Sequence, residues 1–428
     1  MVHDLGGSVM EKRILYVCNR VFWPPMGGHE VEMYHYSRGL HEHMHYIVDV
    51  YVFDDQAKIK VAKKPTFIDT VYTSVSISKG TKIKNLLKKS LFGNEAWPIQ
   101  CALYYSQDNI KKLNEIVVNG QYDAIFVDMV RLAPYYEAFG KASLKKILDI
   151  DDTLSKRYRR QLLSVDEKTV IAGQYNEKLP FFLQKILTSS FIKKIVLRFE
   201  IPRMENAEKK YGELYDKVVF VSSIETDEFN TKYPGNKAVT VAMGVDFPYY
   251  SKPIDVEVEK GTASFVGNMK TAANVDSVRM IINQILTYST KLKRVDFIGG
   301  CSDELVKEYK DNPKVRFTGQ VEDLRPFVKA TELFLSPLAY GTGIKTKILE
   351  AMAMGMPVIT NSIGAEGIPA KHGVHWMTSD DPKELGRFID EIIENPNEGT
   401  KMGRAAQEFV KKDFQWEYIF NQFSRLGL

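Results

Sequence analysis

The sequence predicts an α/β protein built from two doubly wound parallel sheets. Three observations predict this class: short apolar runs alternate with helical stretches, a glycine-rich stretch follows an apolar run in each half of the chain, and the alternation pauses once near residue 250. At 428 residues the chain is longer than one ordinary hydrophobic core accommodates, so two domains are expected.

The first half begins with an apolar run at 13–18, which leads into a glycine-rich loop and an amphipathic stretch from His29 to about Leu40. Strands separated by helices form parallel sheets with right-handed crossovers. We therefore expect a disordered lead over 1–12 and one doubly wound domain over 13–250, with helical insertions within about 80–110 and 155–210. The other apolar runs of this half lie at 47–53, 124–130, 146–150 and 217–223.

The second half repeats the alternation and predicts another doubly wound domain over 251–412, before terminal helices that include 413–428. In such sheets ligands bind beyond the carboxyl ends of the strands, and both glycine-rich stretches fall at such ends. We therefore expect the two domains to face one another across a central cleft. The apolar runs of this half lie at 263–268, 294–300, 314–319, 332–338 and 357–360.

The composition is that of a soluble globular protein, with 44% hydrophobic and 26% charged residues. A net charge of +4 is too small to indicate a nucleic-acid partner. The three cysteines are far apart, which fits neither a disulfide framework nor a zinc site and suits a reducing compartment. No apolar stretch approaches the ~20 residues of a membrane span, and the N-terminus lacks the apolar core of a secretory signal. We expect a cytoplasmic protein.

The stretch GTGIKTKILEAMAMGMPVITNS, residues 341–362, has the composition of an anion site at a helix start. Glycines let the backbone approach a ligand, amides at a helix N-terminus attract anions, and two lysines suit a diphosphate. A glutamate one or two turns further on can accept both hydroxyls of a ribose. The alternative is a capped surface helix with solvated lysines. The residues concerned are Gly341, Thr342, Gly343, Lys345, Lys347 and Glu350.

The stretch LEAMAMGMPVITNSIGAEG, residues 349–367, resembles the donor-site motif of family 4 glycosyltransferases, the large retaining group with the GT-B fold. The resemblance covers nearly the whole chain and is loosest from about 60 to 210. It implies an acceptor-side Rossmann-like domain, a nucleotide-sugar-binding domain over 251–412, and a last helix over 413–428 that packs back on the first domain. Further matching stretches are 27–40, 217–229, 243–246, 265–278 and 315–343.

Carried over by position, the resemblance assigns roles to single residues. Gly27 and Gly28 would let the backbone reach the donor, Glu350 would bind ribose, and the backbone of 341–343 would hold sugar and phosphate. Lys270, together with Lys345 or Lys347, would neutralise the leaving diphosphate, so no metal is required. The chain departs from the family at two positions, since Thr342 stands where a glutamate is usual and Asn268 where an arginine is frequent. The donor sugar therefore stays open.

The loop LDIDDTLSKRYRRQ, residues 148–161, carries Asp149, Asp151 and Asp152 after an apolar strand. Asp151 or Asp152 could bind an acceptor hydroxyl or relay its proton. An Asp-x-Asp metal site is a second interpretation, and helix capping by Asp152 or Thr153 a third. Asp128, at the end of another strand, is a further candidate for the cleft.

Four charged or histidine-rich segments stay open between a function and ordinary packing. Basic amphipathic stretches at 82–93 and 181–199 fit either an anionic membrane surface or the protein core. The run Lys156, Arg157, Arg159 and Arg160 fits a phosphorylated lipid carrier or a solvated helix face. The histidines of HEHMHY, residues 41–46, have a spacing that can bind zinc, but a helix-to-strand turn is the favoured interpretation.

These observations predict a retaining glycosyltransferase that moves a hexose from a nucleotide diphosphate sugar to a hydroxyl of a glycan or lipid-linked acceptor, in bacterial surface polysaccharide biosynthesis. A donor-binding but inactive subunit that supports a partner transferase is one alternative, and a nucleotide-sugar epimerase of the same fold is another. The expected residues of catalysis are Asp151, Asp152, Lys270 and Lys345. The expected donor-binding residues are Gly27, Gly28, Asn268, Lys270, Gly341, Thr342, Gly343, Lys345, Lys347 and Glu350.

Overall fold

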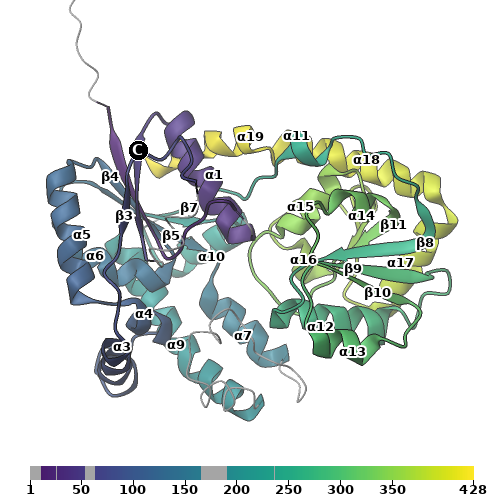
Figure 1. Ribbon diagram of the computed structural model, residues 1–428, viewed down its shortest axis with the longest axis horizontal. Coiled ribbons are helices and arrows are strands. Elements are labelled where there is room, and N and C mark those ends of the chain that lie inside the picture. The colour runs from purple at the N-terminus through teal and green to yellow at the C-terminus, as the bar shows by residue number, and fades with distance from the viewer. Residues whose placement is uncertain (1–10, 26, 54–62, 165–189, 236) are drawn as a thin grey trace, which may run out of the picture.

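The computed structural model has two lobes that lie side by side, each with a twisted parallel sheet covered by helices (Figure 1). It describes residues 11–25, 27–53, 63–164, 190–235 and 237–428. The expected disordered lead over 1–12 and the first part of the basic stretch 181–199 lie largely outside the described residues.

The first lobe contains a seven-stranded sheet of order β3-β2-β1-β4-β5-β6-β7, in which all pairs are parallel. Its inner strands are continuous apolar runs because helices cover both faces. The strands are β1 (Arg13–Cys18), β2 (Ile47–Val52), β3 (Val71–Thr73), β4 (Ala124–Asp128), β5 (Lys145–Asp151), β6 (Lys217–Phe220) and β7 (Ala238–Thr240).

The helices of the first lobe include a long amphipathic α5 and a 25-residue α9. They are α1 (Gly28–Glu42), α3 (Lys79–Asn85), η1 (Leu86–Leu91), α4 (Ile99–Tyr104), α5 (Gln107–Gly120), η2 (Val130–Tyr135), α6 (Tyr136–Phe139), α7 (Leu154–Ser164), α9 (Ser190–Leu214), α10 (Ser223–Lys232) and α11 (Phe247–Tyr250), the last on the connection to the second lobe.

The second lobe contains a six-stranded parallel sheet of order β10-β9-β8-β11-β12-β13. The strands are β8 (Glu259–Val266), β9 (Arg294–Ile298), β10 (Val315–Gly319), β11 (Thr331–Leu335), β12 (Val358–Thr360) and β13 (Met377–Thr378). Its helices are α12 (Ala272–Met280), η4 (Ile281–Ile285), α13 (Asp303–Tyr309), α14 (Arg325–Lys329), α15 (Thr346–Ala353), α16 (Ser362–Ala365), α17 (Pro382–Glu394) and α18 (Pro396–Asp413).

The chain ends with α19 (Trp416–Phe420) and η5 (Asn421–Leu426), which return to the first lobe. Trp416 is buried and stacks on His35 of α1 with 4.2 Å between ring centroids. Phe420 packs against Gly39 so closely that a methyl group there would lie 2.5 Å from its ring. The two lobes are therefore connected both near residue 250 and through the terminal helices (Figure 1).

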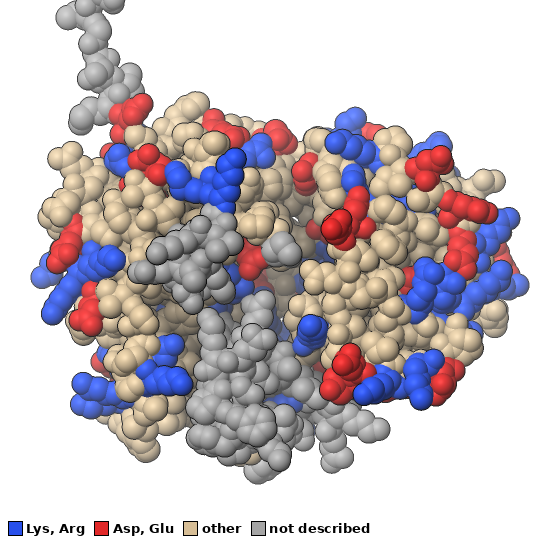
Figure 2. All heavy atoms as spheres, viewed as in Figure 1, with Lys and Arg blue, Asp and Glu red and all other residues tan. Residues whose placement is uncertain are grey.

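The order of the strands in each sheet indicates where a ligand would bind. In each sheet the order reverses between the first strand and a later one: between β1 and β4 in the first lobe, and between β8 and β11 in the second. Ligands of open α/β sheets bind at such switch points, beyond the carboxyl ends of the strands. The loops after these strands lie where the lobes meet, and the surface is hollowed between the lobes (Figure 2). Among the described residues, no helix has the length and apolarity of a membrane span.

Candidate functional site

Two helix N-termini approach each other from opposite lobes. The helix α1 begins at Gly28, directly after the loop that follows β1, and α15 begins at Thr346. A methyl group on Gly28 would lie 3.5 Å from the Oγ1 atom of Thr346. The first amides of a helix have no partner within it and carry a partial positive charge. The junction between the lobes is therefore suited to an anion.

The loop before α15 is held by its own lysine. The Nζ atom of Lys345 donates to the carbonyls of Thr342 at 2.6 Å and Gly343 at 2.5 Å. Burial lowers the pKa of Lys345 to about 8. Gly343 has a φ of +67°, and a methyl group there would lie 3.3 Å from Val221 of the first lobe, so both its conformation and its position favour glycine.

One turn into α15, a lysine and a glutamate share a half-buried environment. Lys347 donates to Asn274 at 3.2 Å and lies over the ring of Phe265. Burial, with the charge of Lys345, lowers the pKa of Lys347 to about 7, against the attraction of Glu350. Burial also raises the pKa of Glu350 to about 7, against its hydrogen bond with Tyr250. Both side chains are thus poised to change charge when an ionic ligand binds.

The loop after β8 reaches the same region. Asn274, in the first turn of the helix α12 that follows this loop, contacts Lys347, while Asn268 in the loop accepts a hydrogen bond from the backbone of Lys270 at 3.1 Å. The Lys270 side chain is exposed near Gly300, at the end of β9. The 341–350 segment is thus joined to the start of α12 through Asn274, for which no role was predicted from the sequence.

The first lobe presents a buried cluster of carboxyl groups around one imidazole. His29, in the first turn of α1, has Nε2 at 2.9 Å from Asp128 and Nδ1 at 3.3 Å from both Glu32 and Asp151. Asp149 is joined to the cluster because its Oδ1 accepts from the backbone N–H of Asp151 at 2.9 Å. The side chains come from α1 and from the carboxyl ends of β4 and β5, next to the switch point of the first sheet.

The residues of the cluster shift one another's pKa values. Burial opposes the charge of His29, but Asp128, Asp151 and Glu32 outweigh burial and raise its pKa well above the ordinary value. Burial and the neighbouring charges raise the pKa of Glu32 to about 8 and that of Asp149 well above its usual range. Burial also opposes ionisation of Asp151, yet its hydrogen bond and charge interaction with His29 lower its pKa. Asp151 therefore favours the ionised form more than Glu32 and Asp149 do.

The backbone at Asp151 is strained. Its φ is +63°, a left-handed conformation that is uncommon for a residue with a side chain. The strand β5 has a register shift between Asp149 and Asp151, which turns the end of the strand. Such strain persists where the surrounding structure fixes it, and it often occurs at functional sites. Here it directs the Asp151 carboxylate to His29.

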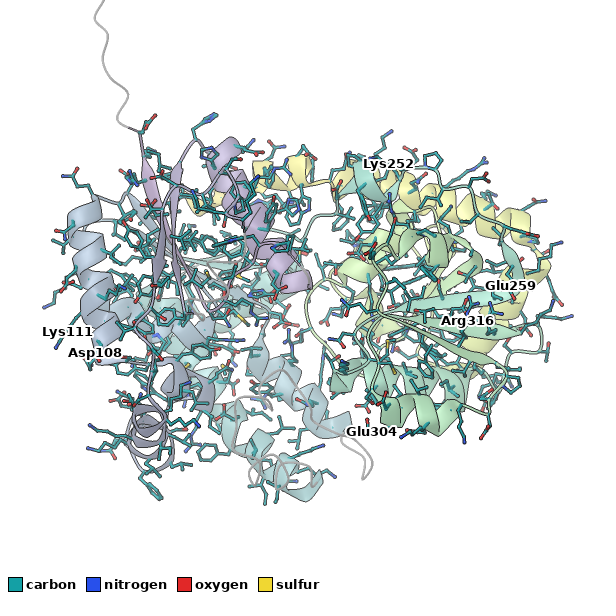
Figure 3. All side chains as sticks on the ribbon, in the orientation of Figure 1. Asp108, Lys111, Lys252, Glu259, Glu304 and Arg316 are labelled. Atoms are coloured by element: carbon teal, nitrogen blue, oxygen red, sulfur yellow. The ribbon has the colours of Figure 1, made fainter. Side chains whose placement is uncertain are left out.

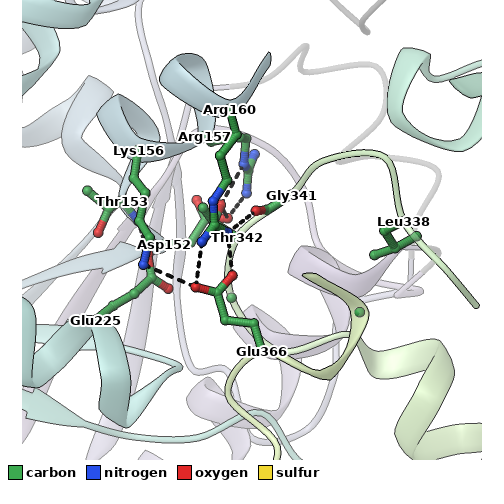
Figure 4. Close-up of polar contacts among 12 residues, drawn as sticks. Asp152, Thr153, Lys156, Arg157, Arg160, Glu225, Leu338, Gly341, Thr342 and Glu366 are labelled. Atoms are coloured by element: carbon green, nitrogen blue, oxygen red, sulfur yellow. Dashed lines mark hydrogen bonds and ion pairs between the residues drawn. The ribbon is translucent and has the colours of Figure 1, made fainter. Parts of the chain in front are cut away.

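Asp152, the next residue, makes a different contact. It is almost fully buried, and its Oδ2 accepts hydrogen bonds from the hydroxyl of Thr342 at 2.5 Å and from Arg157. Arg157 in turn donates to the Thr342 hydroxyl at 3.0 Å. This network joins the start of α7 in the first lobe to the glycine-rich turn of the second lobe (Figure 4).

The rest of α7 also bridges the lobes. Arg160 donates to the carbonyl of Gly341 at 2.5 Å and forms an ion pair with Glu366. Lys156 lies 3.0 Å from the same Glu366 carboxylate (Figure 4). Arg159 pairs with Glu205 of its own lobe, and Lys156 has a second partner there in Glu228. The run therefore forms neither a solvated face nor, in this state, an open phosphate site.

The remaining alternatives from the sequence are also resolved in part. The amides of Thr153 and Ser155 at the start of α7 donate to Glu225 and Glu208, so helix capping does not explain Asp152. The stretch 41–46 contains the end of α1 and a turn before β2, as favoured. The sequence analysis gave no role to His29 or Glu32, although their i, i+3 spacing directly after Gly27 and Gly28 places both on the side of α1 that faces β4 and β5.

Comparisons with known proteins found one family model and two relatives. Residues 260–395 match the family model described as glycosyl transferases group 1. An uncharacterized 44.6 kDa protein of the cps region of Klebsiella pneumoniae is 22% identical over 60% of this chain and 68% of its own length. An uncharacterized glycosyltransferase of Methanocaldococcus jannaschii is 26% identical over 35% of this chain and 38% of its own length.

Solved structures confirm the predicted GT-B fold over almost the full length. HepE of Anabaena, solved in complex with UDP, superposes with a TM-score of 0.62 at 14% identity and covers 96% of this chain and 98% of its own. The sucrose-phosphate synthase of Thermosynechococcus elongatus has a TM-score of 0.67 at 14% identity, over 97% and 98% of the two chains. TarM of S. aureus, solved with UDP among its ligands, has a TM-score of 0.64 at 10% identity, over 97% and 99%.

Proposed function

We propose that the chain is a group 1 glycosyltransferase that transfers a hexose from a nucleotide diphosphate sugar to a hydroxyl of a glycan or lipid-linked acceptor, with retention of configuration. The approach of the α1 and α15 N-termini carries this proposal, because it creates an anion site between the lobes. Transfer requires a site where a diphosphate can leave while a hydroxyl attacks from the other lobe. A role in bacterial surface polysaccharide synthesis is supported by the relative from a cps region.

The second lobe would hold the donor. Amides at the start of α15, with Lys347, Lys345 and Lys270, would stabilise the charge that develops on the leaving diphosphate, without a metal at the phosphates. Glu350 would accept the ribose hydroxyls, which requires its charged form. A UDP-sugar is the first donor to test, because HepE and TarM are both similar in fold and were solved with UDP.

The first lobe would hold the acceptor. Asp151 has a lowered pKa and lies at the edge of the His29 cluster. We therefore propose that it binds the acceptor hydroxyl and accepts its proton. Asp152 is engaged with Thr342 and Arg157, and we assign it the positioning of the donor loop rather than the proton.

The proposal is tested with the purified full-length chain and a panel of nucleotide sugars. We expect thermal stabilisation by one nucleoside diphosphate and turnover of its sugar, both strongly reduced in Glu350→Ala. A ligand at ~100 times its Kd stabilises by about 2.7 kcal/mol. Unchanged turnover in Glu350→Ala would contradict the donor assignment. Donor binding with no turnover against any acceptor would favour the inactive-subunit alternative, and interconversion of donor epimers would favour the epimerase.

We also propose that the first lobe contacts an anionic membrane surface through α3 and η1. Four exposed apolar side chains recur on this segment: Ile83 at 59%, Leu87 and Leu91 at 41%, and Phe92 at 81% exposure. The first three are spaced four residues apart and thus share one side of the helix. Five lysines and no acidic residue lie between 70 and 94, which suits anionic lipids.

This surface is tested by sedimentation with vesicles of phosphatidylcholine and an anionic lipid. Each large apolar side chain that enters the interface contributes about 1.5–3 kcal/mol, so Ile83→Ser with Phe92→Ser should weaken binding by roughly 100-fold or more. Val118→Ser is the matched control, because Val118 is 68% exposed on α5 of the same lobe. Equal loss in the control, or binding to neutral vesicles alone, would contradict the proposal.

A further inference from the structure

The His29 cluster has the geometry of a metal site. The Nδ1 atom of His29 lies 3.3 Å from Oε2 of Glu32 and 3.3 Å from Oδ2 of Asp151. One ligand atom from each of the three residues lies within 4.8 Å of the others. The cluster thus offers one nitrogen with an oxygen 3.3 Å away on each of two carboxylates, and these two oxygens lie within 4.8 Å of each other.

These separations match a small tetrahedral ion. Zinc binds histidine nitrogen and carboxylate oxygen at about 2.0–2.2 Å, so adjacent ligands of a tetrahedral site lie roughly 3.3–3.5 Å apart. An octahedral magnesium site, with bonds of about 2.1 Å, would bring adjacent ligands to roughly 3.0 Å. An imidazole among the ligands also favours zinc over magnesium or calcium.

The surroundings of His29 support the same conclusion independently. Its second ring nitrogen, Nε2, lies 2.9 Å from Asp128, which is the usual partner of a metal-binding histidine. The second carboxylate oxygen of Glu32, Oε1, is buried without a hydrogen-bond partner, and so is Oδ2 of Asp149, which lies beside the three proposed ligands. Buried carboxylates require hydrogen bonds, countercharges or a metal.

We propose that His29 Nδ1, Glu32 and Asp151 bind one Zn²⁺ ion, with Asp128 orienting the imidazole. The sequence predicted no metal anywhere in the site, and this proposal departs from that prediction by placing an ion on the acceptor side. Three protein ligands leave a fourth position open, as in catalytic zinc sites. That position is available to an acceptor hydroxyl, whose pKa the ion would lower, so with zinc bound Asp151 would hold the ion and would not take the proton itself. This last role, unlike the binding of zinc, rests on the proposed function.

The test measures metal binding on the untagged full-length chain after treatment with a chelator. Calorimetry with Zn²⁺ should give one site per chain, and Co²⁺ in its place should give the visible absorption of a tetrahedral complex. His29→Ala should abolish this site. Asp128→Asn, which leaves the three ligands in place, should weaken it by roughly 10–100-fold. Circular dichroism and thermal unfolding establish that each variant is folded.

The chain offers a matched control in its other histidine group. His43 and His45 lie at the end of α1 and in the turn before β2, so a variant with both changed to alanine loses two histidines but keeps the cluster. It should bind Zn²⁺ as the parent does. No stoichiometric binding by the parent, unchanged binding by His29→Ala, or loss in the control would each overturn the proposal. Because binding is measured without a nucleotide sugar, failure of the metal site and failure of the proposed transfer are distinguishable.

Discussion

The two lobes use the same sheet order to build opposite electrostatic environments. Both place their chemistry beyond the carboxyl ends of strands at a switch point. In the first lobe the residues that follow the strands are carboxyl groups around His29, while the second lobe supplies amides, Lys345 and Lys347. The strand order thus fixes where a site forms, and the few residues after each strand fix its charge.

The difference corresponds to the two ends of a transfer reaction. A leaving diphosphate accumulates negative charge, which lysines and amides stabilise. An attacking hydroxyl loses a proton, which a carboxylate can accept. Residues on the outer faces, such as Lys111 on α5, lie far from the junction of the lobes and serve as controls (Figure 3). Variants that change the charged groups of one lobe at a time can therefore separate the two roles.

The largest effect is expected from Lys347→Met, which keeps an apolar side chain of similar length but removes the cation whose Nζ lies over the ring of Phe265. Removing one group that stabilises developing charge typically costs 10²–10³ in kcat, so a loss of this size is expected for the transfer. Steady-state kinetics with a saturating donor measure it. Lys111→Met should keep kcat within about twofold of the parent. A Lys347 variant that raises only the KM of the donor would show that the side chain binds ground state and transition state equally.

Asp152→Asn tests the contact between the two lobes, in which Asp152 accepts a hydrogen bond from Thr342. A hydrogen bond to a charged group contributes about 1.5–3 kcal/mol, and because Arg157 is 38% exposed the lower end applies, so a roughly tenfold increase in donor KM is expected. Arg159→Gln is the control on the same helix, since Arg159 pairs with Glu205 within its own lobe. A fall in kcat at unchanged KM would instead show that Asp152 acts in the chemistry, as the sequence predicted.

The sequence predicted the second lobe better than the first, for a physical reason. The 341–350 segment is contiguous, so one stretch of chain carries glycines, lysines and glutamate together. The His29 cluster is assembled from α1, β4 and β5, whose proximity exists only after the sheet has formed. Asp128 and Asp151 could be named as strand ends, but nothing local showed that His29 would lie between them.

A similar limit applies to α7. Its basic run reads as a solvated face because its partners, Glu366 and Thr342, lie about 180 to 210 residues away and in the other lobe. The spacing of residues along a helix predicts which side chains share a face. It does not predict which residues of another lobe that face contacts. Domain organisation followed from periodicity because each strand and helix is a local pattern, whereas contacts between the lobes are not.

The pH dependence of binding separates the two charged groups of α15. Free Lys347 has a pKa of about 7 and free Glu350 also about 7, while that of Lys345 is about 8. Pyrophosphate favours the charged lysines, so it raises their pKa and takes up protons, and its affinity should fall as pH rises through 7 and 8. The fall is at most about tenfold per pH unit for each lysine.

A nucleoside diphosphate should behave differently, because its ribose needs the ionised form of Glu350, which is gained as pH rises through 7. Its affinity should therefore pass through a maximum near neutral pH or fall less steeply than that of pyrophosphate. Calorimetry over pH 6–9 with both ligands measures the contrast. Parallel curves for the two ligands would mean that Glu350 does not bind the ribose. In Glu350→Gln the difference between the ligands should disappear.

The smallest effect is expected where the two helix N-termini meet. In Gly28→Ala the new methyl group would lie 3.5 Å from the hydroxyl of Thr346, an ordinary contact that needs no movement of the backbone. Gly28 is also in α1, where alanine is favoured over glycine by up to about 1 kcal/mol. We therefore expect unchanged or slightly increased stability and a donor KM raised by only about threefold, because the methyl group narrows the approach to the amides. Gly343→Ala is the informative comparison, since its φ of +67° and its contact with Val221 should make it both less stable and less active. If Gly28→Ala abolished donor binding while Gly343→Ala did not, the diphosphate would lie against α1 rather than α15, and the assignment of the positive side of the site to the second lobe would be wrong.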